Sequence, residues 1–205
     1  MNNVSVLELI RVKISDDDIY NSGKASIFFD VYPNNQNITE ELLYAHQPVT
    51  NHKVPIYATS PIAIGKLDYK ITIKMDFTII KGPAIIIARK GYAGRLFVVE
   101  DTEFIVHEDA YPIKPKSEFI ENINLHWFAN HYNEEFQANR TSTWGIGDFP
   151  RTRFSNMNIT IPKINVQNYI AELYIRRKNQ IDLIKEFENN VFNEMDKNIL
   201  RIIKN

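Results

Sequence analysis

Residues 163–205 carry the pattern that most constrains the fold of this chain. Apolar residues recur there at steps of three and four from Val166 to Ile202, and neither proline nor glycine interrupts them. This spacing predicts one long amphipathic helix. At about 1.5 Å per residue, the helix would extend roughly 57 Å, which is longer than a domain of this size is wide.

A helix of that length cannot be covered along its whole length by the domain that it leaves. A single apolar seam flanked by charged residues is typical of a helix that pairs with a second long helix as a coiled coil. We therefore predict pairing through this seam, and a bent or broken helix that folds back onto the sheet is the alternative. The seam consists of Ile170, Leu173, Ile181, Ile184, Phe187, Val191, Met195 and Ile199.

Residues 1–162 have a different hydrophobic period. Short runs rich in β-branched residues alternate there with turns that contain Gly, Pro or Asn, which predicts a curled, mostly antiparallel sheet. Residues 117–136 predict a helix, with Ser117 as its cap. The predicted strands are residues 25–31, 54–58, 69–73, 77–80, 84–88, 95–99 and 104–112. The fold class is therefore α+β, with a β-rich domain in residues 1–162 and the long helix in residues 163–205.

Composition narrows the functional classes. The chain has 205 residues, no cysteine and a formal net charge of −1. Disulfides and cysteine nucleophiles are excluded, and binding to nucleic acid would have to come from local clusters of Lys and Arg. The chain start lacks a signal-peptide pattern, and no apolar run approaches the roughly 18 residues of a membrane span. We therefore expect a cytoplasmic protein that does not bind membranes.

Two segments concentrate positive charge, small residues and hydroxyl groups. Residues 81–95 contain no acidic residue, and residues 140–153 contain only Asp148. Exposed amides, guanidinium groups and hydroxyls at this density suit phosphate oxygens and base edges, whereas ordinary solvated loops are the alternative interpretation. The candidate binding residues are Lys81, Arg89, Lys90, Tyr92, Arg95, Arg140, Thr141, Thr143, Arg151 and Arg153.

Motifs of the common enzyme classes do not occur in the sequence. It contains no G-x-S-x-G elbow, no G-x-x-x-x-G-K-[ST] phosphate loop and no Asn/Asp-Pro-Pro-aromatic methyltransferase motif. On a helix, His126 and His131 would point about 140° apart, which disfavours a metal site. We predict a noncatalytic protein without metal or cofactor, and an enzyme using His126, His131 and Glu135 is the least favoured alternative.

Three stretches resemble, in this order, the specificity subunits of type I restriction-modification systems. Residues 53–57 (KVPIY), with a later Gly65, resemble the opening of the family's recognition domain. Residues 80–94 (IKGPAIIIARKGYAG), followed by HEDA at 107–110, resemble its central strand-loop-strand motif. Residues 159–171 (ITIPKINVQNYIA) match its junction into a long helix. The resemblance extends from about residue 50 to the end of the chain.

The resemblance implies a function and partners. In that family, a target recognition domain reads double-stranded DNA, paired helices set the distance between two such domains, and methyltransferase (modification) subunits dock on the assembly. Family members usually carry two domain-helix repeats, whereas this chain has one. A two-part DNA site would therefore require a homodimer or a second half-subunit.

We accordingly expect a noncatalytic, sequence-specific DNA-binding subunit that directs methyltransferase and restriction subunits to their target. The candidate binding residues listed above would be its DNA contacts, with Tyr92, Thr141 and Thr143 at base edges. One alternative is the recognition fragment of a single-chain restriction-methylation enzyme. Another is a structural protein that pairs through its long helix and whose basic loops are incidental.

Overall fold

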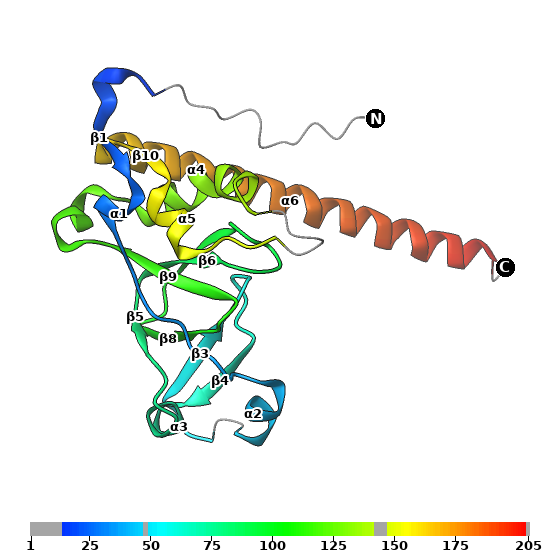
Figure 1. The fold of residues 1–205 in the computed structure, drawn as a ribbon. Coiled ribbons are helices and arrows are strands. Elements are labelled where there is room, and N and C mark those ends of the chain that lie inside the picture. The colour runs from blue at the N-terminus through cyan, green and yellow to red at the C-terminus, as the bar shows by residue number, and fades with distance from the viewer. Residues whose placement is uncertain (1–13, 47–48, 142–146, 204–205) are drawn as a thin grey trace.

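The structure is a computed structural model, and it describes residues 14–46, 49–141 and 147–203. Figure 1 shows a body of sheets and short helices from which one long helix, α6 (Ile164–Ile203), protrudes. This helix has 40 residues. The predicted fold class, a mostly antiparallel α+β body followed by a long C-terminal helix, is confirmed, while pairing of that helix stays a prediction.

The first sheet has the strand order β2-β9-β6-β7 and is antiparallel throughout. Its strands are β2 (Phe29–Val31), β6 (Ala84–Ala88), β7 (Leu96–Val99) and β9 (Ala110–Pro115). Helix α4 (Leu125–Ala138) covers one face, where Trp127 and Phe128 share a buried cluster with Ile85 and Ile87 of β6.

The second sheet has the order β4-β3-β8-β5. It consists of β3 (Lys53–Tyr57), β4 (Gly65–Asp68), β5 (Ile80–Lys81) and β8 (Glu103–Val106). Strands β3 and β8 are parallel, and the other pairs of this sheet are antiparallel. Two short helices, α2 (Glu40–Ala45) and α3 (Tyr69–Lys74), lie at its far end (Figure 1).

Strand β6 is buried on both faces because it stands between two cores. Ile85 and Ile87 point toward the helical layer, whereas Ile86 joins a second cluster with Phe104 of β8. Strand β8 repeats the arrangement, since Ile105 points the other way into a third cluster. Successive side chains of a strand alternate between faces, so a strand covered on both sides reads as a continuous apolar run. This burial explains why residues 84–88 are so clearly marked in the sequence.

A two-stranded antiparallel ribbon connects the body to the long helix. Strand β1 (Ile19–Lys24), which follows a short 3₁₀ turn η2 (Asp16–Asp18), pairs with β10 (Asn158–Pro162), and β10 leads directly into α6. The hydroxyl of Tyr132 in α4 donates to the Thr160 carbonyl at 2.8 Å and accepts from the Thr160 N–H at 2.7 Å. These two bonds tie the helical layer to the strand from which α6 begins.

Two predicted strands are wrong in whole or in part. Residues 25–28 form a helical turn, α1 (Ala25–Phe28), because this lets Ala25 and Phe28 face the same core. Residues 69–73 belong to α3, in which the buried Thr72 hydroxyl donates to the Asp68 carbonyl one turn earlier. Tertiary contacts outweigh the weak strand preference of β-branched residues at both places.

Other predicted boundaries shift. Of residues 77–80 only Ile80 is in a strand, and residues 104–112 divide between β8 and β9. The predicted helix 117–136 consists of a 3₁₀ helix, η3 (Ser117–Asn122), followed by α4. The cap of α4 is Asn124, whose Oδ1 accepts from the Trp127 N–H at 2.9 Å, and not Ser117. In the part of the chain that the structure describes, no helix has the length and apolar character needed to cross a bilayer.

Candidate nucleic-acid interface

The loop that joins β6 to β7 is held against the body near its end and is open at its tip. A Cβ atom on Gly94 would lie 2.5 Å from the Phe136 carbonyl oxygen of α4, whereas a Cβ on Gly91 would meet nothing within 4 Å. Near the tip, Tyr92 is 62% exposed, and the Arg95 guanidinium carbon lies 5.4 Å from the centre of its ring. The tip therefore presents an aromatic ring backed by a cation.

The two positively charged segments predicted from the sequence meet in the structure. Arg89 Nε lies 3.2 Å from Asp148 Oδ1, and the Arg89 carbonyl accepts a hydrogen bond from the Phe149 N–H at 2.9 Å. The second segment is closed by backbone hydrogen bonds between Thr141 and Asp148, and the Thr141 hydroxyl also donates to the Asp148 carbonyl. Residues 89–95 and 147–152 therefore belong to one surface.

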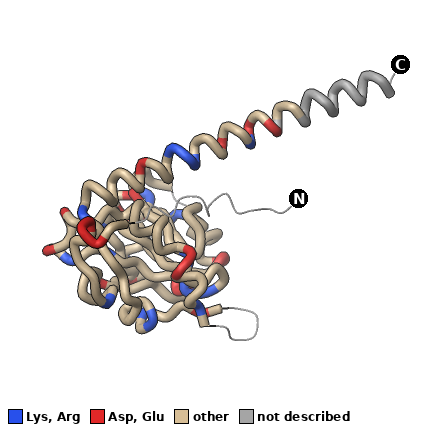
Figure 2. Tube along the Cα trace, turned by 90° about the horizontal axis from the view of Figure 1, so that it is seen from above, with Lys and Arg blue, Asp and Glu red and all other residues tan. Residues whose placement is uncertain are grey.

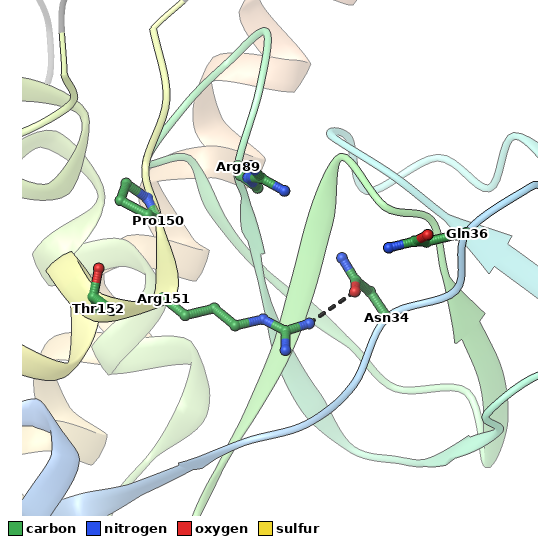
Figure 3. A pocket seen from close by; sticks show the side chains of 6 residues that line it. All are labelled: Asn34, Gln36, Arg89, Pro150, Arg151 and Thr152. Carbon is green, nitrogen blue, oxygen red and sulfur yellow. Dashed lines mark hydrogen bonds between the residues drawn. The ribbon is translucent and has the colours of Figure 1, made fainter.

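Arg151 links this surface to a third segment. It is the first residue of α5 (Arg151–Asn156), and Figure 3 shows its side chain reaching across to Asn34. Arg151 Nη2 donates to Asn34 Oδ1 at 2.8 Å, and its guanidinium carbon lies 5.7 Å from the centre of the Tyr111 ring. Asn34 is itself fixed, since its Nδ2 donates to the carbonyls of Glu108 and Ala110 at 3.1 and 2.8 Å.

Three charged groups act on the hydroxyl of Tyr111, which donates to the Phe149 carbonyl at 3.2 Å. Burial is the largest cause that raises the pKa of Tyr111, and the Asp148 carboxylate raises this pKa further. The guanidinium groups of Arg89 and Arg151 act in the opposite direction. Two cations and one anion therefore act on one phenol.

A pocket of about 390 Å³ opens at this place (Figure 3). Its lining consists of Asn34, Gln36, Arg89, Pro150, Arg151 and Thr152. Lys90 lies next to it on the hairpin, with Nζ 3.4 Å from Asp109 Oδ1. The Asp109 carbonyl accepts from the N–H groups of Arg89 and Lys90, so the turn after β8 holds the base of the hairpin.

Lys81, Arg140 and Arg153 do not line this pocket. Lys81 lies on β5, and the five residues of β6, about 17 Å of strand, separate it from Arg89. Arg153 donates to the Asn139 carbonyl just after α4, and Arg140 is exposed. Thr143 lies outside the described residues.

Sequence reasoning missed Asn34 and Gln36. Both follow β2, the antiparallel pairing of β2 with β9 brings Asn34 beside residues 108–110, and Gln36 lines the same pocket. Their place in the pocket depends on a strand pairing between distant segments. No local motif could therefore have revealed them. Thr152 lay within the second basic segment, but nothing distinguished it from the other hydroxyl residues there.

The structure does not bring together His126, His131 and Glu135, the residues of the alternative enzyme interpretation, through any shared contact among the described residues. His126 Nε2 lies 2.7 Å from Glu100 Oε1, whereas the His131 ring stacks on Trp127 with ring centres 5.2 Å apart. Glu135 is exposed, and partial desolvation of its carboxyl raises its pKa above the usual range. In residues 14–46, 49–141 and 147–203, no group of three His, Asp or Glu side chains is placed to hold a metal ion.

The predicted seam of α6 divides into a covered and an exposed part. Ile170 is only 2% exposed and belongs to the core of the body, so it is not available for pairing as predicted. Leu173 and Ile181 are half-buried. Farther along, Ile184, Phe187 and Val191 are 58%, 69% and 41% exposed. The side chains of Met195 and Ile199 lie outside the described part of the helix.

Comparison with known families identifies this architecture. The model of the type I restriction modification DNA specificity domain matches residues 29–192, and the chain belongs to this family. The match begins well before residue 50, so β2 and the pocket residues that follow it lie within the family domain. No curated protein matches the chain.

Solved structures of type I systems share the fold. The S subunit from M. genitalium superposes with a TM-score of 0.59 at 14% identity, over 83% of this chain and 42% of that one. A chain from a study of complex assembly and conformational transition in a type I R-M system gives 0.58 at 12% identity, over 86% and 43%.

The HsdS subunit from Thermoanaerobacter tengcongensis has a TM-score of 0.51 at 9% identity, over 81% of this chain and 39% of that one. The chain thus spans about two-fifths of the length of these solved chains.

Proposed function

We propose that this chain is a noncatalytic, sequence-reading subunit that binds double-stranded DNA through the surface formed by residues 89–95 and 147–152. The observation that carries the proposal is the convergence of two basic segments on one pocket, beside a hairpin tip with an exposed aromatic ring. Lys and Arg side chains would hold phosphates, and Tyr92 and Thr141 are the candidates for base edges. Membership of the DNA specificity family supports the same assignment.

The proposed partners follow from the family and from the exposed apolar face of α6. A specificity subunit directs methyltransferase and restriction subunits to DNA, and we place this activity in the cytoplasm. We propose that two copies, or this chain and a second half-subunit, pair through α6 to form a two-part DNA site, and the exposed apolar residues Ile184, Phe187 and Val191 support this pairing.

DNA binding is tested by titrating duplexes with the full chain at increasing salt, after selecting the preferred sequence from a randomised pool. We expect the selected duplex to bind at least about 1,000-fold more tightly than a scrambled one. Log affinity should fall linearly with log salt, by about 0.9 for each neutralised phosphate. If the chain binds no duplex at low salt, either alone or with its methyltransferase subunit, the proposed function is wrong.

The proposed pairing surface continues the face by which α6 is held to the body. Ile170, which is buried in the body, precedes Ile184 by two heptads, and Phe187 and Val191 follow at steps of three and four. These residues therefore share one face of the helix, which is covered near the body and exposed beyond it. Figure 2 shows how far α6 extends from the body.

Replacing Ile184 and Phe187 together by Asp is expected to convert a dimer into a folded monomer. Losing two apolar contacts of about 1.5 kcal/mol each would weaken association by at least about 100-fold, and buried carboxylates would add to the loss. Sedimentation measures the mass, and thermal unfolding should show an unchanged body. Asn179→Asp, an exposed change on another face, is the control. A parent protein that sediments as a monomer would contradict homodimerisation.

A further inference from the structure

The pocket beside β6 holds hydrogen-bond donors that the protein does not use. Arg89 contacts Asp148 through Nε, and Arg151 contacts Asn34 through Nη2. A guanidinium group carries five N–H donors, so most donors of both arginines remain available. The Gln36 amide and the Thr152 hydroxyl also have no hydrogen-bond partner among the described residues, and both belong to the lining.

The concave shape of the site indicates which part of a DNA molecule it can bind. Base edges lie at the floor of a groove, where a protruding element reaches them, and here the exposed hairpin tip with Tyr92 is such an element. A concave site accepts a group that projects from the duplex instead, and the backbone phosphates project. Two guanidinium groups beside an amide and a hydroxyl suit the non-bridging oxygens of a phosphodiester.

The pocket is organised before any ligand binds. Asn34 is held by two backbone carbonyls and in turn holds Arg151, while Asp148 holds Arg89. The Arg151 guanidinium also lies over the Tyr111 ring. Side chains that are already fixed lose little conformational entropy on binding, which favours a site that sets the position of its ligand.

We infer that the pocket of Gln36, Arg89, Arg151 and Thr152 seats a single backbone phosphate of the bound DNA and thereby sets where the β6–β7 hairpin meets the bases. This inference rests on the proposed function, and it assigns to the two arginines a positioning role rather than base readout. A phosphate contact carries no sequence information. Loss of the contact should therefore weaken target and non-target duplexes by the same factor.

The test is a set of duplexes of the selected sequence, each with one phosphate replaced by an uncharged methylphosphonate. With the parent chain, one position in each half-site should lower the affinity by about tenfold. Arg151→Gln should lower the affinity for every duplex by about tenfold for each bound copy of the chain and should abolish the sensitivity at that position. It should also reduce the salt slope by about 1 for each bound copy.

Two further variants distinguish a specific effect of the pocket from a general effect of the charge of the protein. Arg176→Gln removes an exposed arginine of α6 that lies 3.5 Å from Glu172, and the methylphosphonate profile should stay as in the parent. The double variant Arg89→Gln/Asp148→Asn leaves the net charge of the protein unchanged. It should nevertheless lose the sensitivity at the same phosphate, because the effect depends on the Arg89 guanidinium group in the pocket and not on the net charge of the protein.

Other results would overturn the inference. If Arg151→Gln weakens only the selected sequence, the arginine reads a base. If DNA binds but the profile of Arg151→Gln equals that of the parent, the pocket does not seat a phosphate, although the proposed function stands. If the parent binds no duplex, both fail. If inorganic phosphate at millimolar concentration stabilises the parent but not Arg151→Gln against thermal unfolding, while DNA binding is the same in both, the pocket is a small-anion site instead of a DNA site.

Discussion

Replacing Gly94 by Ala is expected to lower the free energy of unfolding by roughly 3 kcal/mol, whereas Gly91→Ala should lower it by about 1 kcal/mol. Both glycines have positive φ angles, 86° and 68°, so both variants carry the cost of a left-handed backbone. The two positions differ in the room that they leave for a Cβ atom. A Cβ on Gly94 would lie 2.5 Å from the Phe136 oxygen and 2.7 Å from the Gln137 nitrogen, and these backbone atoms of α4 cannot rotate away.

The comparison is made by urea unfolding of the two variants and the parent. The same steric contact should also push the hairpin away from α4 and move Arg89, Tyr92 and Arg95 from the surface proposed to bind DNA. Gly94→Ala should therefore bind the selected duplex less tightly than Gly91→Ala does. Equal losses of stability in the two variants would show that the close approach of Gly94 to α4 does not hold the hairpin.

Replacing Gln167 by Ala is expected to lower the free energy of unfolding by about 3 kcal/mol, because it leaves several buried polar groups without partners. Gln167 is fully buried at the base of α6. Its Oε1 accepts from the Asn124 N–H at 2.9 Å, and its Nε2 donates to the carbonyls of Asn122 and Pro162, both at 2.7 Å. One side chain thus joins α6, the start of α4 and the end of β10.

Thermal or urea unfolding measures this loss, and hydrogen exchange locates it. The Asn124 N–H should exchange faster in Gln167→Ala, because its acceptor is gone. Gln180→Ala removes an exposed glutamine from the same helix and should change stability by less than about 0.5 kcal/mol. If the two variants unfold alike, Gln167 does not fasten the long helix to the body.

Local patterns were sufficient for several elements. The long helix follows from an apolar period sustained over some ten turns, which needs no knowledge of distant residues. Strand β6 is recognisable because burial on both faces leaves no polar position in residues 84–88. The residue pattern of the junction at 159–171 is explained by burial. Its residues Ile159, Ile161, Gln167 and Ile170 are all buried where β10 passes into α6.

Elements that depend on competing tertiary contacts were predicted less well. Residues 25–28 and 69–73 have the composition of strands, yet they form helical turns that place Ala25 and Phe28, or Thr72, against buried neighbours. The free-energy differences between local conformations are small, so a few buried contacts decide between them. The same applies to the start of α4, where the Asn124 cap determines the first residue of the helix.

For the candidate site, the sequence by itself determined which segments are basic and rich in small and hydroxyl residues. Only the tertiary structure decided that Arg89 and Arg151 share a pocket, that Asn34 and Gln36 complete it, and that Lys81 lies elsewhere. The physical reason is that composition and periodicity are local properties. The pocket is instead created by strand pairings between distant segments, β2 with β9 and β6 with β9.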